Sequence, residues 1–411
     1  MNATASALDT GDTAWMLVST AMVLFMIPGL ALFYGGLARS KNMLGTMMHS
    51  FITMGVITLQ WMVIGYSLAF SDGGNGLVGG IDLAFLRGIG PESLHGSIPA
   101  FLWIAFQGAF ACITPALISG AIAERIRFGP YIVFILLWST LVYDPVCHWV
   151  WHPNGFLAQA GAIDFAGGLV VHLTSGIAGL AACIILGKRH GLERGIMPHN
   201  MVHVVLGAGI LWFGWFGFNA GSAVGSNGTA ALAFLNTFVG PAAGICTWLL
   251  IEKAHLGKSS ALGGATGAIA GLAAVTPAAG SVLPFAAMAL AAVTAGVCYV
   301  FVAKKQSMGY DDALDAFGVH GIAGIVGPLA IGVIASQGVN SLLFHGSDTA
   351  LGGMDQLLAQ VKALAAVGGY SMVVTGILVI TIEKTIGFRV GKDVEEQGLD
   401  LSLHGEKAYN H

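Results

Sequence analysis

The sequence has few charged residues. Of its 411 residues, 17 are Lys or Arg and 21 are Asp or Glu, so charged side chains make up 9% of the chain and hydrophobic ones 55%. A soluble domain carries roughly a quarter charged residues. This composition excludes an ordinary soluble protein and predicts a lipid bilayer as the surrounding medium, with no nucleic acid as a partner.

Cysteine is also scarce. The five cysteines, Cys112, Cys147, Cys183, Cys246 and Cys298, are scattered through apolar segments without CxxC spacing. Their odd number and their placement argue against a disulfide framework and against a zinc site. We interpret them as small core residues, and we expect neither a metal nor a cofactor.

The few charges fall in short clusters that separate long hydrophobic windows. A hydrocarbon core takes roughly 20 helical residues, and the bilayer offers backbone polar groups no partners, so windows of this length predict helices. The sequence therefore predicts an all-α membrane protein with eleven transmembrane helices. The windows are at about 14–37, 46–70, 98–122, 128–150, 165–186, 200–219, 229–251, 261–279, 283–303, 316–335 and 361–382.

Lys and Arg are distributed unevenly between the two sets of loops. If the first helix runs from outside to inside, 15 of the 17 lie in inner loops and the tail, and only Arg87 and Lys362 lie outside. This bias predicts a multi-pass protein of the cytoplasmic (inner) membrane with an extracytoplasmic N terminus and a cytoplasmic C terminus. We divide the chain into a transmembrane domain, residues 1–390, and a short polar tail, residues 391–411.

Glycine is abundant, with 60 residues. Gly263, Gly267 and Gly271 form a GxxxGxxxG pattern in the eighth window, and such faces let helices approach closely. The sequence predicts a tight bundle without a wide aqueous pore.

Two histidines occupy matching places. "DFAGGLVVHLTSGIAGL" and "DALDAFGVHGIAGIVG" each put an Asp eight residues before a His, Asp164 before His172 and Asp312 before His320. A five-helix unit has an odd number of crossings, so a second copy would be inverted relative to the first. We place the two repeats at about 14–186 and 200–335, followed by the eleventh helix.

The inverted repeat has a geometric consequence. Eight residues of about 1.5 Å each place either histidine about 12 Å from its own face of a core about 30 Å thick. The two imidazoles are therefore predicted to meet near the midplane. A single such histidine could be interhelical glue, but two at related positions favour a path that both line. We interpret Asp312 and Asp315 as helix caps. Asp164 lies nearer the outer mouth, and both a role there and structural support stay open for it.

Aromatic side chains accompany the histidines. Most stripes of this kind are core packing, but aromatic rings beside a hydroxyl at a membrane surface can also trap a small cation. The residues concerned are Phe106 and Phe110 in the third window, Trp151 at the end of the fourth, and Trp215, Phe218 and Ser222 in the sixth.

The sequence resembles the ammonium transporter (Amt/MEP/Rh) family, in its Amt branch, over nearly its full length. The matching stretches are "VLFMIPGLALFYGGLARSKN", "FQGAFACITPALISGAIAERIRF", "IDFAGGLVVH", "GWFGFNAGSA", "GAIAGLAAVTPAAG", "DAFGVHGIAGIVG" and "GLDLSLHGEKAY". The resemblance implies a homotrimer with one narrow pore per chain. It also implies that the tail is ordered and transmits contact with a PII-type signal protein at the cytoplasmic face.

The resemblance also implies roles for individual residues. Trp151, Ser222 and Phe110 match an outer ammonium-binding site, Phe110 and Phe218 a gate, and His172 and His320 a pore-lining pair. The supporting positions are Asp164, Phe106, Trp215 and Thr276, whereas Asp144 and His152 depart from the family pattern near the mouth.

Transport of ammonium and ammonia is the function that the sequence predicts. Moving a bare cation into a low-dielectric core costs on the order of 20 kcal/mol, and each cation–π contact returns about 2 kcal/mol. Ammonium would therefore lose its proton at the mouth and cross as ammonia, with or without a proton passed along the histidines. The alternatives are a haem protein with His172 and His320 as axial ligands, and an ammonium sensor without significant flux. The sequence shows no constellation typical of an enzyme.

Overall fold

The computed structural model describes residues 7–335 and 352–409, and most of this part of the chain is helical. The strands found there, β1 (Leu94–His95) and β2 (Ile98–Pro99), form a short antiparallel hairpin. The predicted all-α class is confirmed.

Eleven helical segments of the described chain are long and apolar enough to cross a membrane, which confirms the predicted number. Some consist of two or three consecutive helices joined by a π-helical turn. The helices are α1 (Thr10–Leu37), α2 (Met43–Gln60), α3 (Tyr66–Phe70), α4 (Ala100–Ile122), α5 (Phe128–Trp138), α6 (Asp144–Trp151), α7 (Phe156–Gln159), α8 (Thr174–Leu186), α9 (Met201–Gly221), α10 (Gly228–Leu256), α11 (Ala261–Val275), α12 (Pro284–Lys304), α13 (Ile322–Ile334), α15 (Met354–Thr385) and α16 (Lys392–Gln397).

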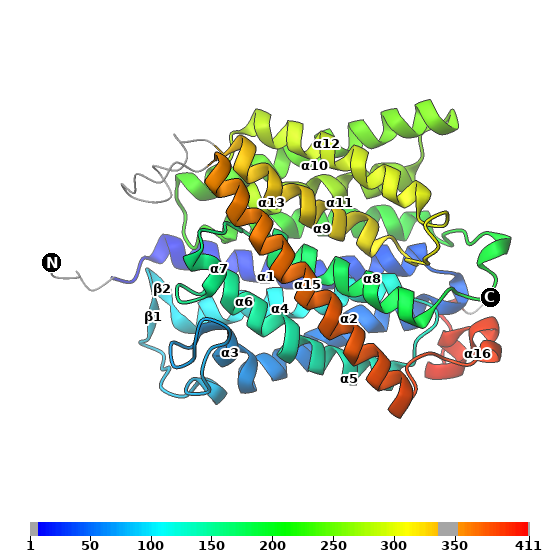
Figure 1. The fold of residues 1–411 in the computed structure, drawn as a ribbon, viewed down its shortest axis with the longest axis horizontal. Helices are drawn as coiled ribbons and strands as arrows, with labels where there is room; N and C mark the ends of the chain where they lie inside the picture. Colours follow the sequence, from blue (N-terminus) through cyan, green and yellow to red (C-terminus); the bar gives the residue numbers. More distant parts are fainter. Residues whose placement is uncertain (1–6, 336–351, 410–411) are drawn as a thin grey trace.

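The first and last spans are longer than their apolar windows. α1 begins at Thr10 because the Asp9 side chain caps it by accepting the Asp12 N–H at 2.8 Å. α15 has 32 residues, so it is about 48 Å long. That length exceeds a core of about 30 Å, and the helix runs obliquely across the bundle (Figure 1).

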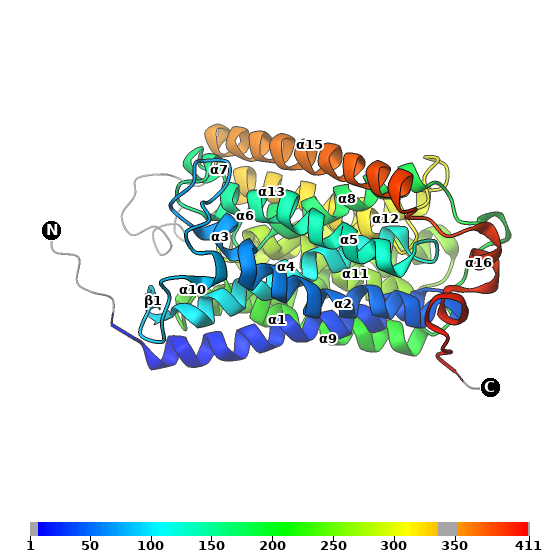
Figure 2. The same cartoon turned by 90° about the horizontal axis from the view of Figure 1, so that it is seen from below.

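The helices run along the long axis of the molecule between two opposite ends (Figure 1). We call the end near Asp9 the N-terminal end and the end that holds α16 the tail end. α1 and α9 lie side by side along one side of the bundle, and α15 covers the opposite side (Figure 2). The spans containing α4, α8, α11 and α13 are the most buried.

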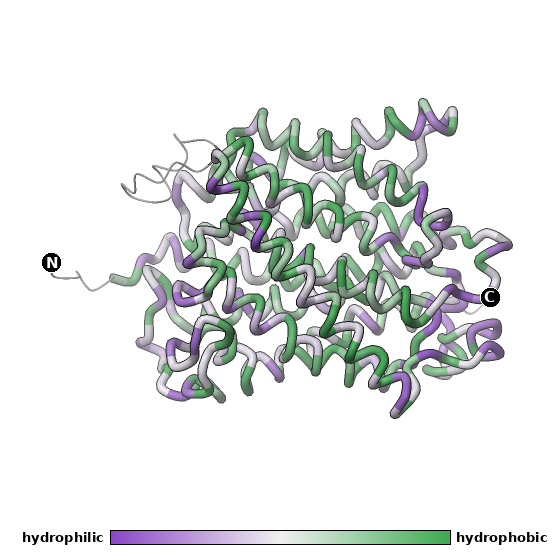
Figure 3. Tube along the Cα trace, in the orientation of Figure 1, coloured by the Kyte–Doolittle hydropathy of each residue, from purple (hydrophilic) through white to green (hydrophobic). Residues whose placement is uncertain are grey.

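Hydrophilic residues gather at the two ends, and hydrophobic residues fill the length between them (Figure 3). Large apolar side chains such as Leu59, Phe213 and Val373 are exposed on the sides of this middle zone. Such a belt is stable only in contact with lipid or with another apolar surface. The chain is an integral membrane protein.

The spans that end in α8 and α13, Gly168–Leu186 and Phe317–Ile334, run in opposite directions, and each helix contacts the π-helical turn that begins the other span. A methyl group on Gly176 would lie 2.2 Å from the Gly321 nitrogen, and one on Gly324 would lie 2.5 Å from the Leu173 nitrogen. Leu173 and Gly176 follow His172 by one and four residues, and Gly321 and Gly324 follow His320 by the same two distances. Each contact therefore joins the later glycine of one segment to the residue directly after the histidine of the other. This reciprocal contact is the relation that an inverted repeat produces.

The glycine pattern of the eighth span does serve close packing. Methyl groups on Gly267 and Gly271 would lie 2.8 Å from the carbonyl oxygens of Gly244 and Gly240 on α10. The cysteine interpretation holds for four residues but is wrong for Cys246, which is exposed on α10. A window that is apolar throughout does not tell which of its faces lies outward.

Candidate functional site

Trp151 is the last residue of α6, at the N-terminal end of the bundle. The helix ends there because His152 takes an extended conformation, with φ −81° and ψ 136°. The Trp151 indole N–H donates to the Asp164 carbonyl oxygen at 2.8 Å. Its ring meets Phe110 edge-on, with centroids 5.8 Å apart. The side chain is partly exposed, which leaves aromatic surface accessible from this end.

Phe110 of α4 and Phe218 of α9 close the space beside Trp151. Their rings are stacked with centroids 4.1 Å apart, and Phe106 packs against Phe110 at 4.9 Å. Ser222 lies one helical turn beyond Phe218, where its hydroxyl donates to the Phe218 carbonyl oxygen at 2.8 Å. Both stacked rings are only 1% exposed, so the aromatic barrier is closed in this structure.

His172 and His320 lie on the other side of this barrier. Their rings are nearly parallel, with centroids 5.2 Å apart, and their Nδ1 atoms are 3.3 Å apart. At this distance one Nδ1 donates its proton to the other in a hydrogen bond, and both rings are neutral. The donating ring then has a lone pair on Nε2, and the accepting ring has an N–H there. The pair therefore offers one donor and one acceptor to a small polar molecule.

Trp215 and Thr276 hold this pair in place. The Trp215 ring stacks on His172 with centroids 5.4 Å apart, and its indole N–H donates to the Thr276 hydroxyl at 2.8 Å. Thr276 in turn donates to the Leu272 carbonyl oxygen at 2.8 Å. Thr276 thus contacts Trp215, which in turn stacks on His172.

The space beside the histidines is narrow and apolar, with a volume of about 10 Å³. That is room for about one water-sized molecule. Sequence reasoning missed its aliphatic walls, because an apolar residue on a membrane helix looks the same whether it faces lipid or a lumen. The aliphatic walls include Met26, Leu30, Ile113, Val171 and Leu211.

The haem alternative does not fit this geometry. Axial ligands must face an iron from opposite sides of a porphyrin plane. The Nδ1 atoms of His172 and His320 are 3.3 Å apart and in hydrogen-bond contact, which leaves no room for that plane between them.

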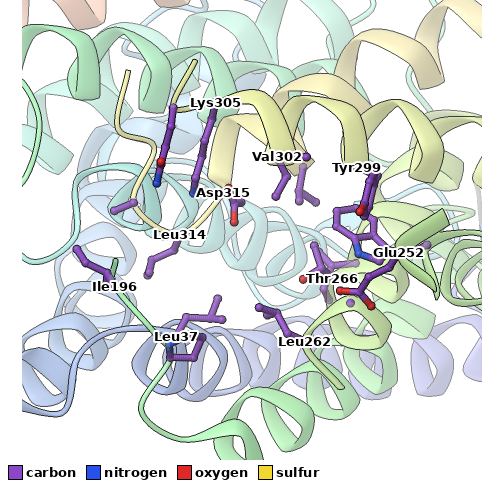
Figure 4. Close-up of a pocket in the computed structure, with 18 of the residues that line it drawn as sticks. Leu37, Ile196, Glu252, Leu262, Thr266, Tyr299, Val302, Lys305, Leu314 and Asp315 are labelled. Carbon is purple, nitrogen blue, oxygen red and sulfur yellow. Dashed lines mark hydrogen bonds and ion pairs between the residues drawn. The ribbon is translucent and has the colours of Figure 1, made fainter. Parts of the chain in front are cut away.

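Toward the tail end, a cavity of about 450 Å³ lies next to the narrow space (Figure 4). Phe33, Ile269 and His320 line both spaces, so the two adjoin each other. We call the larger space the vestibule. Figure 4 shows Lys305 and Asp315 on one of its sides and the polar groups of Glu252, Thr266 and Tyr299 on another. From the sequence alone, Lys305 is only one of the charges of an inner loop.

Two buried carboxylates begin the segments that carry the histidines. Asp164 accepts four backbone N–H groups, from residues 167–170, at 2.6–3.0 Å. Asp312 accepts three, from residues 316–318, at 2.8–3.1 Å. Burial raises the pKa of both carboxyls, that of Asp312 to about 6, while the backbone N–H groups oppose the rise. The predicted cap at Asp312 matches these contacts, and Asp164 makes contacts of the same kind.

The prediction for Asp315 was wrong, because its side chain does not cap the helix. It forms an ion pair with Lys305, with Nζ and Oδ1 2.6 Å apart. Its backbone has φ 62°, a left-handed conformation that turns the chain between Asp312 and the helix. A carboxylate just before a helix is compatible with either arrangement, and only the path of the turn decides between them.

At the tail end a buried ionic network joins segments that are distant in the sequence. Arg189 lies 2.8 Å from carboxylate oxygens of both Glu124 and Asp311, and Arg125 lies 2.9 Å from Asp311. The tail packs beneath it, where Asp400 accepts the N–H groups of residues 44 and 45 at 2.9 and 2.8 Å. The tail is therefore ordered as far as the structure describes it. Sequence reasoning used these charges only to orient the chain.

Comparisons with known proteins agree with this geometry. The Ammonium Transporter Family matches residues 14–409. An ammonium transporter of Bacillus subtilis is 46% identical over 410 residues, covering 98% of this chain and 99% of the relative. The crystal structure of Mep2 from Saccharomyces cerevisiae is similar with a TM-score of 0.88 and 36% identity, covering 94% of this chain and 89% of that one. A solved structure described as "Sensor Amt Protein" has a TM-score of 0.87 and 28% identity, covering 95% of this chain and 98% of that one.

Proposed function

The chain belongs to the ammonium transporter family, and from that premise we propose that it recruits ammonium at Trp151, deprotonates it, and passes ammonia between His172 and His320. The observation that carries this proposal is the stacked imidazole pair in an apolar space of about 10 Å³.

Recruitment takes place at the N-terminal end, which we propose is extracytoplasmic because 15 of 17 Lys and Arg residues would then lie inside. Trp151 and Phe110 provide aromatic surface, and the Ser222 hydroxyl provides an oxygen that accepts from a cation. A desolvated cation–π contact contributes about 2 kcal/mol. This is enough to concentrate ammonium at the mouth but not to carry it inward.

Deprotonation follows from the dimensions of the space beyond the phenylalanines. A volume of about 10 Å³ cannot hold a hydration shell, and desolvating an ion costs several kcal/mol even after relaxation. Ammonia is neutral and escapes this cost. The stacked rings of Phe110 and Phe218 block the entrance to this space. When the two rings move apart, ammonia molecules enter one at a time.

The two histidines meet ammonia with one acceptor and one donor. Ammonia donates to the Nε2 lone pair of one ring and accepts the Nε2–H of the other. The proton that ammonium gives up binds the free Nε2 of one ring, and the proton between the two Nδ1 atoms, 3.3 Å apart, shifts to the other ring. That second ring then releases its Nε2 proton toward the vestibule, so one proton enters the relay and one leaves it. Ammonia is then protonated again in the vestibule, where the walls are polar and water has room.

We further propose a homotrimer and a PII-type signal protein that contacts the tail end. Both follow from family membership, and the ordered tail supports the second. Asp400 fastens the tail to the start of α2, so the tail is attached to the same end as the vestibule.

The test is ammonium-evoked current from purified protein on solid-supported membranes. We expect ammonium pulses to evoke a current and potassium pulses to evoke none. His172→Leu and His320→Leu keep side-chain bulk but remove the relay, and should reduce the current at least tenfold. His203→Leu, on α9 outside both cavities, is the matched control. Currents in both pore variants equal to wild type would overturn the role of the histidines, and ammonium flux without charge displacement would overturn the relay.

A second candidate function is ammonium sensing without significant flux. It is supported by the similarity to the structure described as "Sensor Amt Protein". The two functions differ in accumulation of methylammonium by cells, which a transporter produces and a sensor does not. The position of the narrow space directly beside the vestibule, with His320 lining both, favours transport.

A further inference from the structure

Asp144 is a fully buried carboxyl group that lines neither cavity. It is the first residue of α6 and faces Gln60, the last residue of α2. The Gln60 side-chain N–H donates to Asp144 Oδ2 at 2.7 Å. The second carboxyl oxygen, Oδ1, has no hydrogen-bond partner among the described residues.

The surroundings of Asp144 hold acceptors rather than cations. The same Gln60 amide donates to the Thr140 hydroxyl at 3.2 Å. Gln60 Oε1 and the Ser139 hydroxyl are buried without partners in the described structure, and Ser139 lies one π-helical turn before Asp144. We call Gln60, Ser139, Thr140 and Asp144 the Asp144 cluster. Among the described residues no Lys, Arg or His forms an ion pair with Asp144.

Two other buried carboxylates of the chain show how many partners an ionised carboxylate has inside this protein. Asp164 accepts four backbone N–H groups, and Asp311 contacts two arginines. Asp144 receives one neutral hydrogen bond. A single neutral donor does not replace the hydration of a charge inside a membrane. A proton on Oδ1 removes the charge of Asp144. It also makes Oδ1 a hydrogen-bond donor in a cluster where Gln60 Oε1 and the Ser139 hydroxyl have no partner.

We propose that Asp144 is a proton-binding site outside the pore, occupied at neutral pH, and that its neutral carboxyl group forms a lock with Gln60 between α2 and α6. Both partners adjoin π-helical turns, Trp61–Gly65 after Gln60 and Ser139–Tyr143 before Asp144. Such turns often mark functional positions. α6 carries Trp151 at its other end, so the lock anchors the helix of the mouth. The proposal holds whichever molecule crosses the pore.

Infrared spectroscopy of the full chain in lipid tests the protonation state directly. We expect the wild-type spectrum at neutral pH to contain a carbonyl stretching band of a protonated carboxylic acid that is absent from Asp144→Asn. The band should shift when the protein is transferred to deuterated buffer. If Asp144→Asn instead removes a carboxylate band and no acid band, the group is ionised and the proposal is wrong.

Thermal stability provides the second readout. In Asp144→Asn a neutral amide replaces a neutral acid and can pair reciprocally with Gln60, so the melting temperature should stay within a few degrees of wild type. Asp144→Leu, which cannot pair, should lower it clearly. Asp164→Asn is the matched control, because the same substitution there removes a carboxylate that holds four N–H groups, and we expect a large loss. An equal loss in Asp144→Asn and Asp164→Asn would overturn the neutral lock.

Discussion

Gly176 of α8 lies against the backbone of Gly321, so closely that a methyl group on Gly176 would sit 2.2 Å from the Gly321 nitrogen. Gly321 follows His320 directly, and Gly176 follows His172 by one helical turn. The contact therefore sets the separation of the two imidazoles, whose Nδ1 atoms are 3.3 Å apart. Small residues at a helix crossing allow this approach in a membrane.

Gly176→Ala is expected to push α8 away from the π-helical turn Phe317–Gly321 that carries His320. The added methyl group meets backbone atoms, which cannot move aside as a flexible side chain could. Overpacking of this kind costs about 1–3 kcal/mol or more. We expect a lower melting temperature and a loss of methylammonium uptake, measured in purified protein and in cells.

Gly368→Ala is the control for that substitution. A methyl group on Gly368, in the middle of α15, would meet no atom within 4 Å. Alanine also favours helix by about 1 kcal/mol over glycine. The control should keep wild-type stability and uptake, and similar losses in both variants would rule out the crossing as the cause.

Trp151→Leu is expected to weaken recruitment of ammonium without changing the pore. Loss of a cation–π contact of about 2 kcal/mol corresponds to an approximately 30-fold rise in the half-saturating ammonium concentration. Trp151→Phe keeps an aromatic face and should change this concentration by only a few-fold. The measurement is the concentration dependence of the evoked current, and equal values for the two variants would contradict the role of the ring.

Thr276→Val is expected to disturb the histidines from a distance. It removes the hydroxyl that accepts the Trp215 N–H at 2.8 Å, and an unpaired buried donor costs about 1–3 kcal/mol. Because Trp215 stacks on His172, transport should fall together with stability. Thr276→Ser restores the hydroxyl and should restore both, and a Ser variant as impaired as the Val variant would contradict this explanation.

Asp311→Asn should reveal an acid-sensitive contribution to stability at the tail end. Burial raises the pKa of Asp311, but the hydrogen bond and charge of Arg189 and the charge of Arg125 outweigh it and lower the pKa from 3.8 to about 2. Because this pKa is lower in the folded state than in the unfolded state, the ionised carboxylate stabilises the fold above the unfolded-state pKa. This stabilisation, about 2.5 kcal/mol, is lost as the pH falls through the folded-state pKa.

The measurement is the melting temperature of wild type and Asp311→Asn between about pH 7 and pH 2. The variant should be less stable near neutrality, and the difference should shrink as pH falls below about 4. Asp393→Asn, at an exposed position of α16, should show no such dependence. A constant difference between wild type and Asp311→Asn across the range would exclude the ionised carboxylate as its source.

The sequence was sufficient for those features that depend on local composition. The eleven spans follow from windows of about 20 apolar residues. The meeting of His172 and His320 follows from the equal spacing to Asp164 and Asp312 together with the inversion of the repeat. Resemblance to a family, rather than spacing, placed Phe110 beside Phe218, because no rule of periodicity pairs residues on different helices.

The sequence by itself determined that the chain is an integral membrane protein with eleven spans and that its two histidines meet, since hydrophobic length and helical rise are local quantities. Only the tertiary structure decided that Asp315 pairs with Lys305, that Cys246 faces outward and that Asp144 meets a single amide. It also decided that the space beside the histidines has a volume of only about 10 Å³. These outcomes depend on which helix faces meet, and an apolar segment packs against lipid or protein with nearly equal local energy.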